Sequence, residues 1–146
     1  MQALLYLVNN DSINALNELN AAIQIESDVL TPYLLKIQIQ IDNNNLSGAK
    51  RTVEEGLENY DDDNFQLNYL GGIITYRQGD YEEAIEYFED ALSNTTINEI
   101  EAETKMLIAK CYKKDSNSKK ADKWYMDALS EVDDDDENGQ NISINL

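Results

Sequence analysis

The sequence has 146 residues, 42% of them hydrophobic, which is the length of one domain with enough apolar residues to form a core. Its formal net charge of −18 argues against binding to nucleic acid or to an anionic membrane surface, and no apolar run is long enough to span a membrane. The sequence has no histidine, the usual proton shuttle near neutral pH, and its single cysteine cannot form an internal disulfide. A single thiol is compatible with a reducing compartment, and we expect a cytoplasmic protein.

Apolar residues at helical spacing occur in pairs of segments from the start of the chain, and a short polar turn separates the two segments of each pair. In the first pair, Asp11 and Ser12 are good N-cap residues for a second helix that ends near Gln24. In the second pair, we expect Thr31 to cap the first helix and Pro32 to take its first position, where the missing N–H is not needed.

The clearest pair lies in residues 65–92, where a sharp break at Gly79-Asp80 separates two apolar segments. Ala84, Phe88 and Ala91 share one face of the second helix, so a neighbouring helix is able to approach closely around one bulky side chain. The aspartates that precede this pair predict a solvated linker, and a fourth pair of helices follows it and ends near Val132.

The pairs repeat one unit. An alanine recurs after 34, 35 and 37 residues, at Ala15, Ala49, Ala84 and Ala121. The later turns fall at the same phase, at Asn43-Asn44-Asn45, Gly79-Asp80 and Ser116-Asn117. The run QGDYEEAIEYF and its surroundings resemble the tetratricopeptide repeat family, through Gly72, Gly79, Tyr81, Ala84, Phe88 and Ala91. This resemblance implies an all-α fold, a right-handed superhelical solenoid of antiparallel helix pairs.

We therefore predict a tetratricopeptide array over residues 1–132, with repeats at about residues 1–27, 31–60, 65–93 and 98–132. The first repeat is short, so we expect either an abrupt natural start or a chain cut from a longer array. Residues 133–146 are expected to form a disordered acidic tail, because like charges repel one another. Residues 134–139 fit half of a calcium-binding loop, but Asn145 stands where the bidentate glutamate belongs.

No feature of the sequence predicts an enzyme or a cofactor. There is no Gly-rich phosphate loop, no nucleophile elbow and no cluster of metal ligands. Adjacent acids such as Glu82 and Glu83 point to different sides of a helix, so we interpret them as surface charge. Cys111 has no histidine to activate it, and we expect it in the core.

The resemblance implies a non-enzymatic protein–protein interaction module, because the first helices of such repeats line a concave groove that binds a partner peptide. In this register the expected groove residues form three rows, which are Leu35, Leu70 and Leu107, then Gln38, Ile73 and Lys110, then Asp42, Arg77 and Lys114. Alternatively, the three leucines belong to the core. The register is also open by one residue, since Leu67, Leu70 and Ile74 make an equally good core stripe.

The charge distribution favours a protein or peptide partner with acidic residues. Seven of the eleven basic residues lie between Lys105 and Lys123, against two acids, for a local net charge of +5, whereas residues 1–104 carry a net charge of −16. Some related co-chaperones clamp the C-terminal carboxylate of heat-shock chaperones with Lys, Arg and Asn. The matching positions here hold no cation, so we exclude that partner. The alternative function is an assembly element, either a fragment of a longer array or a self-associating solenoid.

Overall fold

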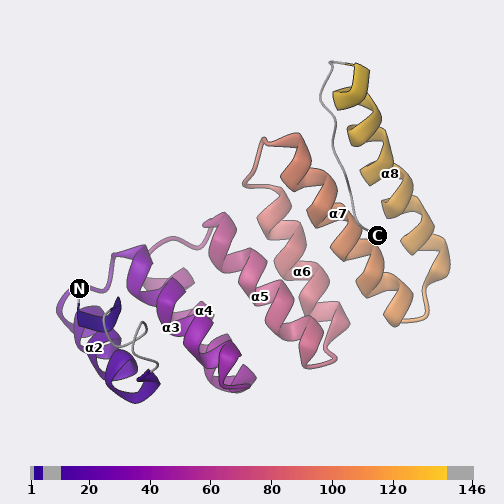
Figure 1. Cartoon of the computed structure of the whole chain (residues 1–146). Helices are drawn as coiled ribbons and strands as arrows, with labels where there is room; N and C mark the ends of the chain where they lie inside the picture. Colours follow the sequence, from indigo (N-terminus) through magenta and orange to yellow (C-terminus); the bar gives the residue numbers. More distant parts are fainter. Residues whose placement is uncertain (1, 5–10, 138–146) are drawn as a thin grey trace. The chain divides into compact units, whose positions relative to one another are not determined.

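The structure, a computed structural model, describes residues 2–4 and 11–137, with side chains as far as Val132. Every regular element in these ranges is an α-helix, as predicted (Figure 1). Residues 2–4 are helical, and seven helices follow with both ends described: α2 (Ser12–Ile25), α3 (Leu30–Asp42), α4 (Leu46–Asn59), α5 (Phe65–Arg77), α6 (Tyr81–Leu92), α7 (Asn98–Lys114) and α8 (Ser118–Glu137).

The chain divides into two compact units, Met1–Asp62 and Asp63–Leu146, and the boundary falls in the aspartate linker predicted from the sequence. In the first unit, α3 packs against both α2 and α4. In the second unit, α5 pairs with α6 and α7 pairs with α8, while α6 also packs against α7 (Figure 1). Each pair is a hairpin because only a short turn separates its two helices.

The same turn closes the first helix of three successive pairs. One residue in each turn has a positive φ, namely Asn44 at 57°, Gly79 at 84° and Ser116 at 61°. The N–H of the following residue then donates to a carbonyl five residues earlier, with N···O distances of 2.7 Å in Asn45→Gln40, 2.9 Å in Asp80→Thr75 and 2.8 Å in Asn117→Tyr112. This hydrogen bond and the positive φ identify each turn as a Schellman motif, which satisfies carbonyls at the end of the helix.

The residue that closes the first helix also begins the second. Its side-chain oxygen accepts a hydrogen bond from the backbone N–H three residues later, which is the N-cap arrangement. The N–H of Gly48 donates to Asn45, that of Glu83 to Asp80 and that of Lys120 to Asn117. Asp11 caps α2 in the same way, as the sequence predicts.

Two predicted helix ends differ from the structure. α3 begins at Leu30, and its N-cap residue is Val29, so Thr31 does not cap it. Pro32 is the third helical residue, where the N–H would still lack an acceptor within the helix, and its absence again costs nothing. α8 runs past the predicted end at Val132 to Glu137, because no Gly or Pro interrupts it before Gly139.

The remainder of the predicted acidic tail, residues 138–146, lies outside the described residues, as do residues 5–10 of the first predicted repeat. Residues 134–137 are helical and therefore do not form a calcium-binding loop.

Glycines let α5 and α6 approach closely around Phe88, which is 1% exposed. A Cβ atom on Gly72 would lie 2.5 Å from the Phe88 ring, and one on Gly71 would lie 2.6 Å from the ring of Tyr87. The core of the second unit consists of Phe88 with Ala84, Ile85, Ile108 and Cys111. The close helix contact inferred from the Ala-Phe-Ala face is thus confirmed, and its partner face is provided by glycine.

The predicted anchor alanines all lie in the core. In the order of the repeats, the side chains of Ala15, Ala49, Ala84 and Ala121 are 0%, 0%, 0% and 2% exposed.

In the first unit, a buried hydrogen bond joins α3 to α4. The Thr52 hydroxyl of α4 donates to Gln40 Oε1 of α3 at 2.7 Å.

Replacing Phe88 with alanine should lower the free energy of unfolding by about 3–5 kcal/mol, because the change leaves a cavity between α5, α6 and α7. Urea unfolding followed by circular dichroism measures this change. The exposed Met126→Ala variant is the control, and its stability should stay close to that of the wild type. Equal stability of the two variants would contradict the packing described for Phe88.

Exchanging residues at the positive-φ positions should change stability in opposite directions. Gly79→Ala should lower the free energy of unfolding by about 1 kcal/mol. The cause is conformational alone, because no atom lies within 4 Å of a Cβ built on Gly79. Ser116→Gly should raise stability by a similar amount, because it relieves a φ of 61°. Urea titration of both variants tests this pair, and a destabilised Ser116→Gly protein would contradict the turn geometry.

Candidate functional site

The residues predicted to line a groove lie in α3, α5 and α7, which are the first helices of their pairs. Those of α5 and α7 belong to the second unit, and we group them as one candidate surface, which we call the α5/α7 face. It consists of Leu70, Ile73 and Arg77 from α5 and Leu107, Lys110 and Lys114 from α7. Residues three or four apart lie on the same side of a helix, so each helix contributes one stripe.

The middle of the α5/α7 face is apolar and only partly buried. Ile73 and Leu107 both pack against the core of the second unit, and Leu70 is partly buried. The alternative that these leucines are core is therefore correct in part, since the core side of Leu107 is covered while some of its surface remains accessible. Leu67 and Ile74 are fully buried, whereas Leu70 and Ile73 are partly buried, so the core stripe of α5 includes two of the three residues of the alternative stripe.

The two ends of the α5/α7 face carry opposite charges. Arg77, Lys110 and Lys114 are exposed where the two helices end. Near the start of α7, Glu103 is exposed and accepts a hydrogen bond from the hydroxyl of Tyr69 on α5 at 3.5 Å. A segment that lies along this face therefore passes from a carboxylate, over apolar side chains, to three cations.

Tyr69 fixes α5 against α7 at the acidic end. Its ring packs edge-on against Phe88, with the ring centres 5.8 Å apart, and contacts Phe65 at 5.4 Å. Burial, and secondly the charge and hydrogen bond of Glu103, raise the pKa of Tyr69 to about 12, so the hydroxyl stays a neutral donor. The sequence interpretation missed this residue, although it directly precedes Leu70 in an aromatic-rich helix.

The predicted residues of α3 have other surroundings in the first unit. Leu35 packs against the cluster of Ala3, Ala15, Leu19 and Ile39. Gln38 and Asp42 are exposed, and Gln38 Nε2 donates to Asp42 Oδ1 at 2.8 Å. These two side chains satisfy one another along the helix, and this row of α3 carries no cation.

A cavity of about 360 Å³ lies between α7 and α8. It is lined by Met106, Lys110, Lys113, Tyr125 and Leu129. Only Lys110 among them was predicted to contact a partner. The missing signal is a comparison between repeats, because these residues stand 37 positions after Tyr69, Ile73, Tyr76, Phe88 and Leu92.

A second hollow, of about 430 Å³, is acidic. Its lining includes Glu82, Glu86 and Glu89 of α6 and a single lysine, Lys120, whose Nζ lies 5.4 Å from the centre of the Tyr112 ring. Burial raises the pKa of Glu89, the neighbouring acids raise it further, and Lys120 opposes them. This surface would repel an acidic partner, unlike the basic end of the α5/α7 face.

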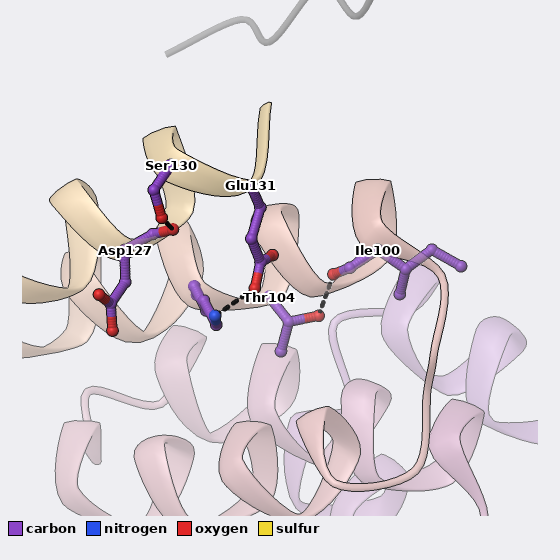
Figure 2. A network of polar contacts seen from close by, with 6 residues as sticks. Ile100, Thr104, Asp127, Ser130 and Glu131 are labelled. Atoms are coloured by element: carbon purple, nitrogen blue, oxygen red, sulfur yellow. Dashed lines mark hydrogen bonds and ion pairs between the residues drawn. The ribbon is translucent and has the colours of Figure 1, made fainter. Parts of the chain in front are cut away.

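One lysine of the basic region is already engaged within the chain. Lys105 of α7 forms an ion pair with Glu131 of α8. Nearby, the Thr104 hydroxyl donates to the Ile100 carbonyl at 2.7 Å (Figure 2). Lys105 and Glu131 are both mostly buried, with side chains 19% and 17% exposed. Lys105 therefore joins the two helices and is not available to a partner.

Comparison with known proteins shows which family part of the chain matches. The family model of the tetratricopeptide repeat matches residues 67–95, which cover most of α5 and all of α6. Two solved structures described as MamA resemble the fold, with TM-scores of 0.79 and 0.83 at 14% and 13% sequence identity. The matches cover 92% and 97% of this chain and 77% and 75% of those chains.

Residues 67–95 thus match one tetratricopeptide repeat, and the chain as a whole shares the helical-repeat fold of these solved structures. A third similar structure, residues 41 to the end of MamA from Desulfovibrio magneticus RS-1, has a TM-score of 0.74 at 13% identity, and the match covers 96% of this chain and 74% of that one. No curated protein sequence matches. The predicted resemblance to the tetratricopeptide repeat and the predicted fold class are thereby confirmed. At these identities the likeness concerns the fold and not the ligands.

Among the residues that the structure describes, no helix is long and apolar enough to cross a membrane.

Removing the charge of Glu103 should lower the pKa of Tyr69 but leave it above the ordinary value, because burial is the larger cause. The ultraviolet absorbance of tyrosinate during a pH titration, compared between Glu103→Gln and wild-type protein, measures this shift. Tyr69→Phe variants in both backgrounds isolate the signal of this tyrosine.

The same shift has a consequence for stability. Since the pKa of Tyr69 is higher in the folded state than its ordinary value of 10.0, its contribution is fully present below pH 10.0 and is lost as the pH rises through about 12. In the titration described above, a Tyr69 pKa in the Glu103→Gln variant equal to that in the wild type would contradict the contact between α5 and α7.

Proposed function

We propose that this chain is a non-enzymatic protein-interaction module that binds an amphipathic partner segment with acidic residues on the α5/α7 face. The tetratricopeptide match and the helical-repeat fold support a role in protein interaction or scaffolding in general terms. The observation that carries the finer proposal is the group of exposed cations at one end of this face, next to accessible apolar side chains.

The three cations of this face are available to a partner. Arg77, Lys110 and Lys114 form no ion pair or side-chain hydrogen bond with any residue among 2–4 and 11–132. Cations that neutralise no acid of their own chain gain most from a carboxylate brought by another molecule. Acidic residues of the partner therefore lie over the ends of α5 and α7.

The rest of the chain restricts where such a partner binds. Residues 1–104 carry a net charge of −16, and the hollow beside α6 is acidic. Electrostatic repulsion disfavours an acidic segment at these surfaces, while the basic end of the α5/α7 face attracts it. The apolar middle of the α5/α7 face stabilises the complex by burying apolar surface of the partner. Glu103 disfavours a carboxylate at the other end of the same segment. The partner segment therefore carries its acidic residues at one end only.

Peptides selected from a displayed random library against the 146-residue chain should carry apolar residues followed by Asp or Glu. We expect Arg77→Glu with Lys114→Glu to weaken binding of such a peptide by about tenfold or more, equivalent to about 1.4 kcal/mol, and to flatten its salt dependence. The matched control is Lys119→Glu with Lys123→Glu, which makes the same charge change at exposed positions of α8. Lys120 is left intact because it packs over Tyr112.

Fluorescence anisotropy of the labelled peptide measures the affinities, and circular dichroism checks the fold of each variant. Equal affinities of the wild type and the Arg77→Glu/Lys114→Glu variant would remove the α5/α7 face as the binding site. Sedimentation of the unliganded protein tests the alternative role in assembly. Self-association that this double variant abolishes would make a second copy of the chain the partner.

A further inference from the structure

The hairpin of α7 and α8 presents a surface beside its cavity that the described residues leave partly exposed. We call the five lining residues, Met106, Lys110, Lys113, Tyr125 and Leu129, the end surface. Leu129 is 49% exposed, which is unusual for a leucine at a helix–helix contact, and both lysines are exposed.

The preceding repeat shows what covers these positions. The equivalent residues, 37 positions earlier, are Tyr69, Ile73, Tyr76, Phe88 and Leu92. The equivalence holds along the whole hairpin, because the positive-φ residues of the two turns, 79 and 116, have the same spacing. All five belong to the core of the second unit or pack against it, together with Ile108 and Cys111 of α7. In that repeat the first helix of the next pair therefore covers the surface.

α7 also shows which side chains a covering helix needs. Ile108 and Cys111 are fully buried against α5 and α6, and Leu107 packs beside them. These residues, at positions i, i+1 and i+4, form a narrow apolar stripe on one side of the helix. On α7 this stripe has a carboxylate near it, since Glu103 accepts the hydrogen bond of Tyr69.

The end surface keeps the apolar floor but differs in charge. Met106, Tyr125 and Leu129 replace Tyr69, Phe88 and Leu92, whereas Lys110 and Lys113 replace Ile73 and Tyr76. A covering helix with apolar or basic residues at those points would leave two cations desolvated without a partner, which is unfavourable. A covering helix with Asp or Glu there would pair with both.

We propose that the end surface binds an amphipathic helix from a partner protein, in the position that α7 occupies on α5 and α6, and that Asp or Glu beside its apolar stripe pairs with Lys110 and Lys113. This contact shares only Lys110 with the α5/α7 face, and it uses α8 and none of the residues of α5. Its recognition resembles that of an amphipathic helix bound in an apolar groove.

Two synthetic helical peptides of the length of α7 test the proposal with the 146-residue chain. Both carry apolar residues at the spacing of Leu107, Ile108 and Cys111, and they differ only in having Glu or Lys at the flanking positions. The glutamate peptide should bind at least about tenfold more tightly than the lysine peptide, and salt should weaken its binding. Titration calorimetry measures both affinities.

Variants then locate the peptide. Lys113→Glu with Leu129→Asp should weaken the glutamate peptide by about tenfold or more. The matched control is Lys119→Glu with Met126→Asp, which reverses one lysine and replaces one exposed apolar residue of α8 outside the cavity. This control, and Arg77→Glu with Lys114→Glu on the α5/α7 face, should leave the affinity within about twofold. If the Leu129→Asp change unfolds the hairpin, Lys113→Glu alone serves in its place.

Three results would overturn the proposal: no binding of the glutamate peptide, equal binding of the two peptides, or equal weakening by the control variant. Sedimentation of the chain alone addresses a second copy as the occupant. The chain could form dimers that do not bind the glutamate peptide and that the Lys113→Glu/Leu129→Asp variant does not form. In that case the occupant of the end surface would be a second copy of the chain and not a partner helix.

Discussion

The arrangement of the helices depends on a turn in which one residue serves two helices. In each of three hairpins, the backbone N–H of Asn45, Asp80 or Asn117 closes the first helix, and its side chain begins the second. This leaves no free linker between the two helices, so their relative direction and rotation are both set locally. The faces that pack across the hairpin, such as Gly72 against Phe88, follow from that rotation. The stripes of side chains that form the α5/α7 face are positioned by the same constraint.

The repeating features of the fold could be predicted because they recur in the sequence. The anchor alanines, the hairpin turns and the N-cap at Asp11 were placed from spacing and residue type alone, and all are found in the structure. Features that depend on neighbouring elements could not be placed in this way. Thr31 has the right chemistry for a cap, but the chain enters α3 at Val29. Leu67, Leu70 and Ile74 are equivalent by spacing, and only the packing of α5 shows which of them is partly accessible.

The candidate surfaces show the same division. The cations Arg77, Lys110 and Lys114 were found from the repeat register, because a stripe at helical spacing is a property of one helix. Tyr69 and the end surface were not, because each is defined by a relation between helices. Whether a Leu at that position is covered, as Leu92 is, or half exposed, as Leu129 is, depends on whether another helix lies against it. Spacing within one repeat is the same in both cases and carries no information about this difference.

The single thiol of the chain lies where the helices of the second unit meet. Cys111 is fully buried in the cluster with Phe88, and burial raises its pKa to about 12, so the reactive thiolate is scarce while the unit is folded. A thiol reagent in solution reaches it only when α7 separates from α6. The rate at which Cys111 is labelled therefore reports how often these helices separate, and no other cysteine contributes to the signal. A partner that holds α7 in place lowers the rate of labelling, so protection of this one sulfur atom reports binding at a distance from the bound surface.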